Sequence, residues 1–172
     1  ASSQGSMRVR QQQWPEVKIG VIEDCAGLGL ATSSLTSHAL QYGDNVQING
    51  LYASEKQEHL AQWLEKQKDY NKVSREANEV PKTFRGRKKV KYVVYTNTSP
   101  CTPFSRIGGN AGSKDPNSNP LKSSIRVIRR HRPHAFLYEQ VKSFVQRPHI
   151  KVKKKLLKKL RAIGDKKKNG NR

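Results

Sequence analysis

The chain has 172 residues, of which 34% are hydrophobic, and this suits one domain with a modest core. With 34 Lys and Arg against 13 Asp and Glu, its formal net charge of +21 predicts binding to polyanions, with nucleic acid as the default partner. The sequence has neither an apolar run near the roughly 18 residues that cross a membrane nor a secretory signal pattern. We therefore expect a protein that is not secreted and has no membrane partner, in a DNA-containing intracellular compartment such as a nucleus, a nucleoid or a viral particle.

Composition along the chain predicts three segments. Residues 1–14 are expected to be disordered, residues 15–164 to form one ordered α/β domain, and residues 165–172 to form a basic disordered tail. Cys25 and Cys101 are too few for a disulfide scaffold, and neither belongs to a CxxC pair or a histidine cluster. The sequence predicts free thiols and no metal site.

The first predicted unit is a strand over residues 17–22, a glycine turn, and a helix over about 31–41. Glycines at such a turn let the backbone approach a ligand, and an acidic residue at the end of the strand can bind a ligand's amine or hydroxyl. Gly-x-Gly alone is a weak signal, however, and without further support an ordinary tight turn between strand and helix is the better explanation.

A second strand is predicted over residues 45–52, and Glu55 follows it. Nucleotide-binding α/β folds place a carboxylate at this point for ribose hydroxyls. The alternative is an acid in the first turn of the helix predicted over about 55–70, where the helix dipole favours negative charge. Residues 71–89 read as a basic loop, either a solvated surface or an edge that contacts phosphates through Arg85, Arg87, Lys88 and Lys89.

The strand predicted over residues 90–95 is followed by Cys101, which lies between Pro100 and Pro103. Prolines fix φ, so the thiol is expected on a rigid loop placed for chemistry. The Gly-, Ser- and Asn-rich stretch 106–119 is expected to be mobile, either as a cover for a substrate or as a connector.

The last third is predicted to form a basic helix over 121–132, a buried strand over 135–141 and a helix over 150–163. Glu139 is then a carboxylate at the end of a buried parallel strand, where open α/β sheets put their sites. The nucleic-acid contacts expected from these helices are Arg126, Arg129, Arg130, Lys153, Lys154 and Lys155. The whole pattern predicts an α/β fold with a Rossmann-like, doubly wound, mostly parallel sheet whose site follows the carboxyl edge.

Three segments resemble motifs of the DNA cytosine-5 methyltransferases, in the family's order. Residues 22–29 are similar to its cofactor motif, residues 100–105 to its catalytic Pro-Cys-Gln-Pro-Phe-Ser, and residues 132–141 to its Arg-Pro-x-x-Phe-x-x-Glu-Asn-Val. Thr102 stands in place of the Gln and Gln140 in place of the Asn. The later motifs and the target recognition domain are not matched, so the resemblance covers the N-terminal catalytic half.

The resemblance implies the S-adenosylmethionine-dependent methyltransferase fold, incomplete at its C-terminal side, with S-adenosylmethionine as cofactor. In the family, a thiolate adds to C6 of a cytosine that has left the base stack, while a carboxylate holds the N3 side. By position Cys101 is the nucleophile, Glu139 the N3 partner and Glu55 the ribose ligand. The remaining cofactor contacts that it implies are Glu23, Ala26, Gly27, Gly29 and Pro100.

Three functions follow as hypotheses. The first is a cytosine-5 methyltransferase acting on DNA, or its catalytic half completed by a second polypeptide. The second is an inactive methyltransferase-like protein that binds nucleic acid in a particle or nucleoprotein assembly, which the net charge and the altered motifs favour. The third is an RNA-directed relative, since positive charge does not distinguish RNA from DNA.

Overall fold

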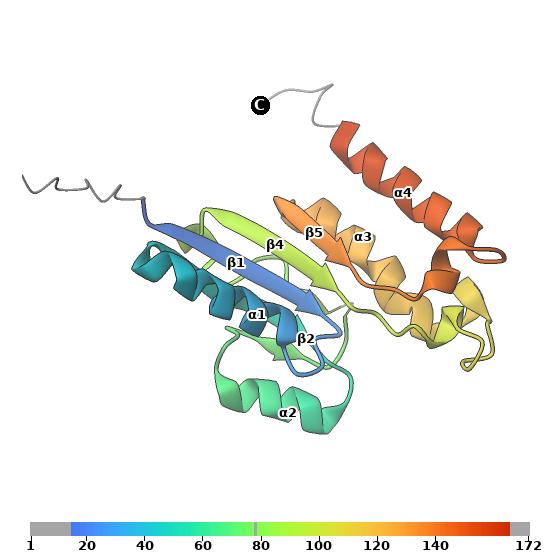
Figure 1. Cartoon of the computed structure of the whole chain (residues 1–172), viewed down its shortest axis with the longest axis horizontal. Helices are drawn as coiled ribbons and strands as arrows, with labels where there is room; N and C mark the ends of the chain where they lie inside the picture. The colour runs from blue at the N-terminus through green and yellow to red at the C-terminus, as the bar shows by residue number, and fades with distance from the viewer. Residues whose placement is uncertain (1–14, 78, 166–172) are drawn as a thin grey trace, which may run out of the picture.

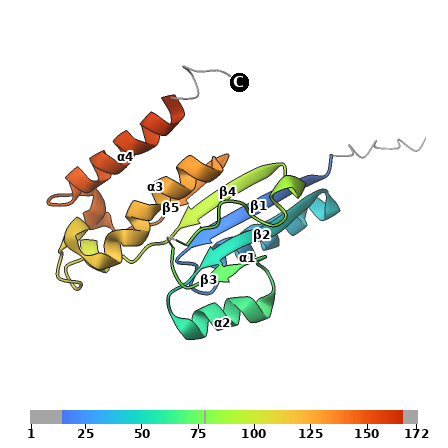
Figure 2. The same ribbon diagram turned by 180° about the vertical axis from the view of Figure 1, so that it is seen from behind.

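The computed structural model describes residues 15–77 and 79–165, and its strands form a five-stranded parallel sheet in the order β3-β2-β1-β4-β5 (Figures 1 and 2). Every recorded pairing between neighbouring strands is parallel. The strands are β1 Val17–Asp24, β2 Val46–Ser54, β3 Val73–Ser74, β4 Tyr92–Asn97 and β5 Ala135–Tyr138. The order reverses between β1 and β4, so the carboxyl ends of these two strands form the switch point where such folds bind ligands.

Helices cover both faces of the sheet. Helix α1, Leu30–Ala39, lies on one face, and α3, Asn119–His131, lies on the other, as the two opposite views show (Figures 1 and 2). Helix α2, Glu58–Gln67, follows β2, and α4, Ile150–Asp165, runs beside α3 at the β5 side. This arrangement confirms the Rossmann-like α/β fold expected from the sequence.

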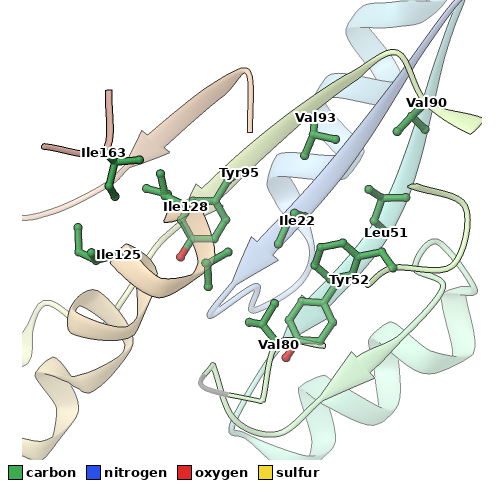
Figure 3. Packing of buried hydrophobic residues seen from close by; sticks show 12 residues of the cluster. Ile22, Leu51, Tyr52, Val80, Val90, Val93, Tyr95, Ile125, Ile128 and Ile163 are labelled. Carbon is green, nitrogen blue, oxygen red and sulfur yellow. The ribbon is translucent and has the colours of Figure 1, made fainter. Parts of the chain in front are cut away.

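The main core lies between the sheet and α3 (Figure 3). Ile22, Tyr52 and Tyr95 come from three adjacent strands and are fully buried against Ile125 and Ile128 of the helix. Each apolar side chain of this size contributes about 1.5–3 kcal/mol when it is removed from water. The same core fixes the carboxyl ends of β1, β2 and β4 relative to one another.

The segments predicted as loops contain short elements. Within residues 71–89, Val73–Ser74 adds the edge strand β3 beside β2, and Arg87–Lys89 forms a single 3-10 turn. Within residues 106–119, Gly112–Lys114 and Pro116–Ser118 are two more 3-10 turns. A two-residue strand has no side-chain alternation that a sequence pattern could show.

The prediction of a long buried strand over residues 135–141 was wrong in two respects. Strand β5 ends at Tyr138, and its side chains are largely exposed: Phe136 is 45% and Leu137 60% accessible. The physical reason is its position, because within the described residues β5 pairs with β4 alone and forms the edge of the sheet.

The expected segment 1–14 lies outside the described residues, as do residues 166–172 of the expected tail, and Asp165 is the last residue of α4. Among the helices that the structure describes, none is both long and apolar enough to cross a membrane.

Candidate active site

The turn after β1 is bonded to both neighbouring strands. The Ala26 N–H donates to the backbone oxygen of Ser54 at 2.9 Å, and the Thr98 hydroxyl donates to the backbone oxygen of Cys25 at 2.7 Å. Cys25 and Gly27 adopt positive φ, at 59° and 56°. The left-handed conformation turns the chain sharply at the switch point and leaves the backbone of Gly27 open, with nothing within 4 Å of a built Cβ.

Glu55 closes this turn from the end of β2. One carboxylate oxygen accepts the Gly27 N–H at 2.8 Å, and the other accepts the Gln57 N–H at 2.8 Å, where Gln57 is the residue that precedes α2. Glu55 is only 7% exposed. In this structure Glu55 supports the glycine turn and accepts an N–H just before α2, which starts at Glu58. Its contact with ribose hydroxyls stays a prediction.

A cavity of about 770 Å³ opens beside this turn. Its wall includes Gly27, Glu55, Thr98, Pro100 and Asn119, which come from the ends of β1, β2 and β4 and from the start of α3. This volume is of the size that small organic ligands occupy in proteins. Pro100 is thereby placed on the cavity, one residue before Cys101.

Glu23 lies beneath the turn, outside the wall of this cavity. It is 2% exposed, and its carboxylate accepts the Ala31 N–H, the Thr32 N–H and hydroxyl, and the Tyr70 hydroxyl. These bonds satisfy the first turn of α1, whose N–H groups have no partner inside the helix. In this structure Glu23 supports the turn from below, and a direct contact with a ligand stays a prediction.

Ala26 and Gly29 also shape the turn without lining the cavity. Ala26 is buried against Ala53, Leu64 and Tyr70. Gly29 has φ 73°, and a Cβ built on it would lie 3.0 Å from side-chain atoms of both Leu64 and Tyr70. The small residues at these two positions are thus explained by packing of the turn against α2 and the chain that follows it.

Asp24 forms a buried network that sequence reasoning missed. It is fully buried and accepts hydrogen bonds from the Ser54 hydroxyl at 2.8 Å and the Tyr95 hydroxyl at 2.7 Å. The Ser54 oxygen in turn accepts the Cys25 N–H at 3.3 Å. Burial raises the pKa of Asp24 to about 6, while both hydroxyl donors oppose that rise. The only signal in the sequence is a second acid at the end of a strand that is buried on both faces.

The two cysteines differ in their chemistry. Burial, followed by the charges of Asp24, Glu55 and Glu76, raises the pKa of the Cys25 thiol to about 12. Cys25 therefore stays a protonated thiol at neutral pH and is a poor nucleophile. Cys101 is half-buried and precedes the 3-10 turn Thr102–Phe104, whose Phe104 N–H donates to the Cys101 carbonyl at 2.9 Å.

The loops that carry Cys101 and Glu139 are bonded to each other. The Gln140 amide donates to the Ser99 carbonyl at 2.6 Å and to the Ser99 hydroxyl at 3.2 Å, and the Glu139 N–H donates to the Asn97 carbonyl at 3.2 Å. The Glu139 side chain is exposed. The Gln140 side-chain oxygen is buried without a partner among the described residues. The predicted catalytic residues thus share the carboxyl edge of the sheet.

The predicted nucleic-acid contacts lie in three places. Arg85 and the turn Arg87–Lys89 precede β4, so they sit at the amino edge of the sheet, at the end opposite Cys101. Arg126, Arg129 and Arg130 are exposed along α3, and the Arg130 guanidinium donates to the Val80 carbonyl at 3.2 Å. Lys153 is half-buried on α4, whereas Lys154 and Lys155 are exposed. The structure brings none of the first group near the candidate site.

In the described part of the chain, no three His, Cys, Asp or Glu side chains lie close enough together to hold a metal ion.

Comparison with known proteins agrees with this arrangement. The model of the family described as C-5 cytosine-specific DNA methylase matches residues 19–166. The chain is also 39% identical over 54 residues to Type II methyltransferase M.SacI of Streptomyces achromogenes. That alignment covers 29% of this chain and 14% of the relative.

Proposed function

We propose that this chain, which belongs to the C-5 cytosine-specific DNA methylase family, carries the catalytic half of a cytosine-5 methyltransferase that acts on DNA. The observation that carries the proposal is the bond between Gln140 and Ser99, which joins the Glu139 loop to the Cys101 loop beside the cavity. A nucleophile, a carboxylate and a ligand cavity are the three parts that the reaction needs at one edge.

The family implies a methyl donor of the S-adenosylmethionine type, and the residues present fit one. The cavity is large enough, Gly27 leaves room for a ligand beside the turn, and the Glu55 carboxylate lies on the wall. We assign Glu55 to the ribose hydroxyls, Gly27 to the amino acid part and Pro100 to the wall near the reacting methyl group. When bound, S-adenosylmethionine supplies an electrophilic methyl group on sulfur.

Cys101 and Glu139 act on the cytosine. The Cys101 thiolate forms a bond to C6, and the electron pair of the C5–C6 double bond moves to C5, while Glu139 holds the N3 side of the ring. With S-adenosylmethionine bound, C5 would take its methyl group as the S–CH3 bond breaks and S-adenosylhomocysteine leaves. The proton on C5 would then pass to a base, and the bond between the Cys101 sulfur and C6 would break as the double bond re-forms. The Cys101 thiolate is regenerated. The base reaches this edge only after it leaves the helix stack.

Cys25 is excluded as the nucleophile by its surroundings. Its thiol lies on the cavity wall next to the carboxylates of Asp24 and Glu55, which disfavour a thiolate. We assign it to the wall of the cofactor cavity, where a neutral thiol packs as a small apolar group.

The partner of this chain is DNA, and we propose that a second polypeptide supplies the recognition part that the matched region does not contain. Charge supports the first proposal: the net charge of +21 favours phosphate contacts over the whole surface. A DNA-containing compartment is the matching location.

The test is transfer of a labelled methyl group from S-adenosylmethionine to duplex DNA, with the chain alone and with candidate partner polypeptides. The proposal predicts label at C5 of cytosine, lost in Cys101→Ser and retained in Ser34→Ala, an exposed change on α1. Label in Cys101→Ser would contradict it. Absence of transfer under every condition, with DNA still bound, would support a protein that only binds nucleic acid.

A further inference from the structure

A second hollow adjoins the cofactor cavity on the side of α3. It has a volume of about 460 Å³ and shares Glu76, Ala77, Asn119 and Pro120 with the cavity wall. We call it the α3 groove; its other lining residues are Lys122, Ser123, Ile125, Arg126, Arg129 and Lys159. The first five of these come from α3, and Lys159 comes from α4, which runs beside it (Figure 2).

The groove is strongly cationic. Lys122, Arg126, Arg129 and Lys159 are all exposed, and none of them forms an ion pair with any side chain that the structure describes. One carboxylate, that of Glu76, lies in the wall. Four cations around one carboxylate leave a positive potential that attracts anions.

The adjoining cavity has the opposite balance. Its arginine, Arg75, is held by Glu58 at 2.7 Å and by Glu65 at 2.5 Å, so its charge is already compensated. The carboxylates of Glu55 and Glu76 remain on the same wall with one further cation, Lys56, so the wall keeps a small excess of negative charge. A sulfonium cofactor suits this cavity, whereas the α3 groove repels a cation, so the two hollows are built for different ligands.

The spacing of the cations fits a phosphate chain. Lys122, Arg126 and Arg129 lie at i, i+4 and i+7 of one helix and therefore form one stripe. At a rise of about 1.5 Å per residue the stripe is about 10 Å long. This is about three nucleotides of a DNA strand at a rise of about 3.4 Å each.

We propose that the α3 groove binds phosphates of the DNA backbone, as a contact separate from the edge where the base reacts. The choice of DNA rests on the proposed function. The Arg126 and Arg129 guanidinium groups donate to phosphate oxygens, and Lys122 and Lys159 add point charges at either side. Such contacts position the duplex without reading its sequence.

The experiment measures binding of the whole chain to a short duplex DNA between about 50 and 200 mM salt, without cofactor. Arg126→Gln/Arg129→Gln removes two charges from the groove. The matched control, Lys66→Gln/Lys72→Gln, removes two exposed charges near α2 and β3. The groove variant and the control therefore have the same net charge. Thermal unfolding of both variants verifies that each still folds.

The proposal predicts that the groove variant lowers DNA affinity about tenfold more than the control and reduces the slope of log K against log salt by about 2, because each lost phosphate contact removes about 0.9. Equal affinity and slope in the two variants would overturn it. Binding of inorganic triphosphate that the groove variant abolishes, with DNA affinity unchanged, would also overturn it in favour of a small phosphate ligand. A slope change seen with duplex RNA and not with DNA would overturn it as well.

Failure of the proposed function gives a different result. Cys101→Ser abolishes methyl transfer under that proposal but leaves the salt slope of DNA binding unchanged. A groove variant with a reduced slope therefore supports the α3 groove even in a chain that transfers no methyl group.

Discussion

Glu55 accepts the backbone N–H of Gly27 at 2.8 Å across the ends of two strands, which makes one carboxylate responsible for the shape of the glycine turn. Its second oxygen accepts the Gln57 N–H. Replacing either oxygen by a hydrogen-bond donor would therefore leave a backbone N–H without an acceptor. The wall of the 770 Å³ cavity and the fold of the turn thus depend on the same side chain.

We predict that Glu55→Gln weakens binding of S-adenosylhomocysteine about 10- to 100-fold, because an amide nitrogen then faces a buried N–H and leaves it without a partner. Isothermal titration calorimetry measures the effect. Glu16→Gln, an exposed change just before β1 at the amino edge of the sheet, is the control and should bind as the unchanged protein does. Equal affinity in Glu55→Gln would mean that this carboxylate has no part in the cofactor site.

The buried Asp24 predicts an unusual dependence of stability on pH. Its pKa is raised from 3.8 to about 6, so between these values the folded protein holds a proton that the unfolded chain has released. The stability that this proton provides is fully present below about pH 4 and is lost as pH rises to 6, by about 3 kcal/mol. This is opposite in sign to the effect of a carboxylate in an ion pair.

Asp24→Asn should remove this slope, since it cannot titrate. Urea unfolding from pH 4 to pH 7 gives the free energy of unfolding for both proteins, and the difference between them isolates Asp24 from the other titrating groups near the edge. These are Glu23, Glu55, Glu76, Cys25 and Tyr95. A difference that does not change with pH would show that folding does not raise the pKa of Asp24.

Gly27 and Gly29 both have positive φ, so substitutions at the two positions can be compared for their cost in stability. Gly27→Ala meets nothing within 4 Å and should cost only the strain of the left-handed backbone, about 1–2 kcal/mol. Gly29→Ala also presses on Leu64 and Tyr70 and should cost about 1–3 kcal/mol more. Denaturant unfolding measures both, and equal costs would contradict the packing described for Gly29.

The two thiols should differ in alkylation. At neutral pH Cys25 has almost no thiolate, because its pKa is about 12. Iodoacetamide followed by mass spectrometry should therefore label Cys101 in the native protein and leave Cys25 unmodified until the chain is unfolded. Labelling of native Cys25 at the faster rate would reverse the assignment of the two roles.

The fold and the turn that carries Cys101 could be predicted from the sequence because both depend on local patterns. β-Branched runs mark β1, β2 and β4, and the prolines around Cys101 mark a rigid loop at a strand end. Family membership, which the motifs at Gly27, Cys101 and Glu139 indicated, is confirmed by the family model over residues 19–166.

The roles of the two acids at the end of β1 could not be predicted in this way. Alternation along the strand sends Glu23 toward α1 and Asp24 toward the opposite face, where Tyr95 lies. Which side chain meets them depends on pairing between segments far apart in the chain. The exposure of β5 was missed for a related reason. A run of apolar residues does not show whether the strand lies inside the sheet or at its edge, or whether another element packs against it.

The most direct test of the central claim is a covalent trap. Duplex DNA that contains 5-fluorocytosine has no proton at C5 to lose, so the bond between the Cys101 sulfur and C6 persists after methyl transfer. With S-adenosylmethionine, the chain and any required partner should form an adduct that survives denaturation, and mass spectrometry should place it on Cys101. An adduct that still forms in Cys101→Ala, or none at all while cofactor and DNA both bind, would contradict the account.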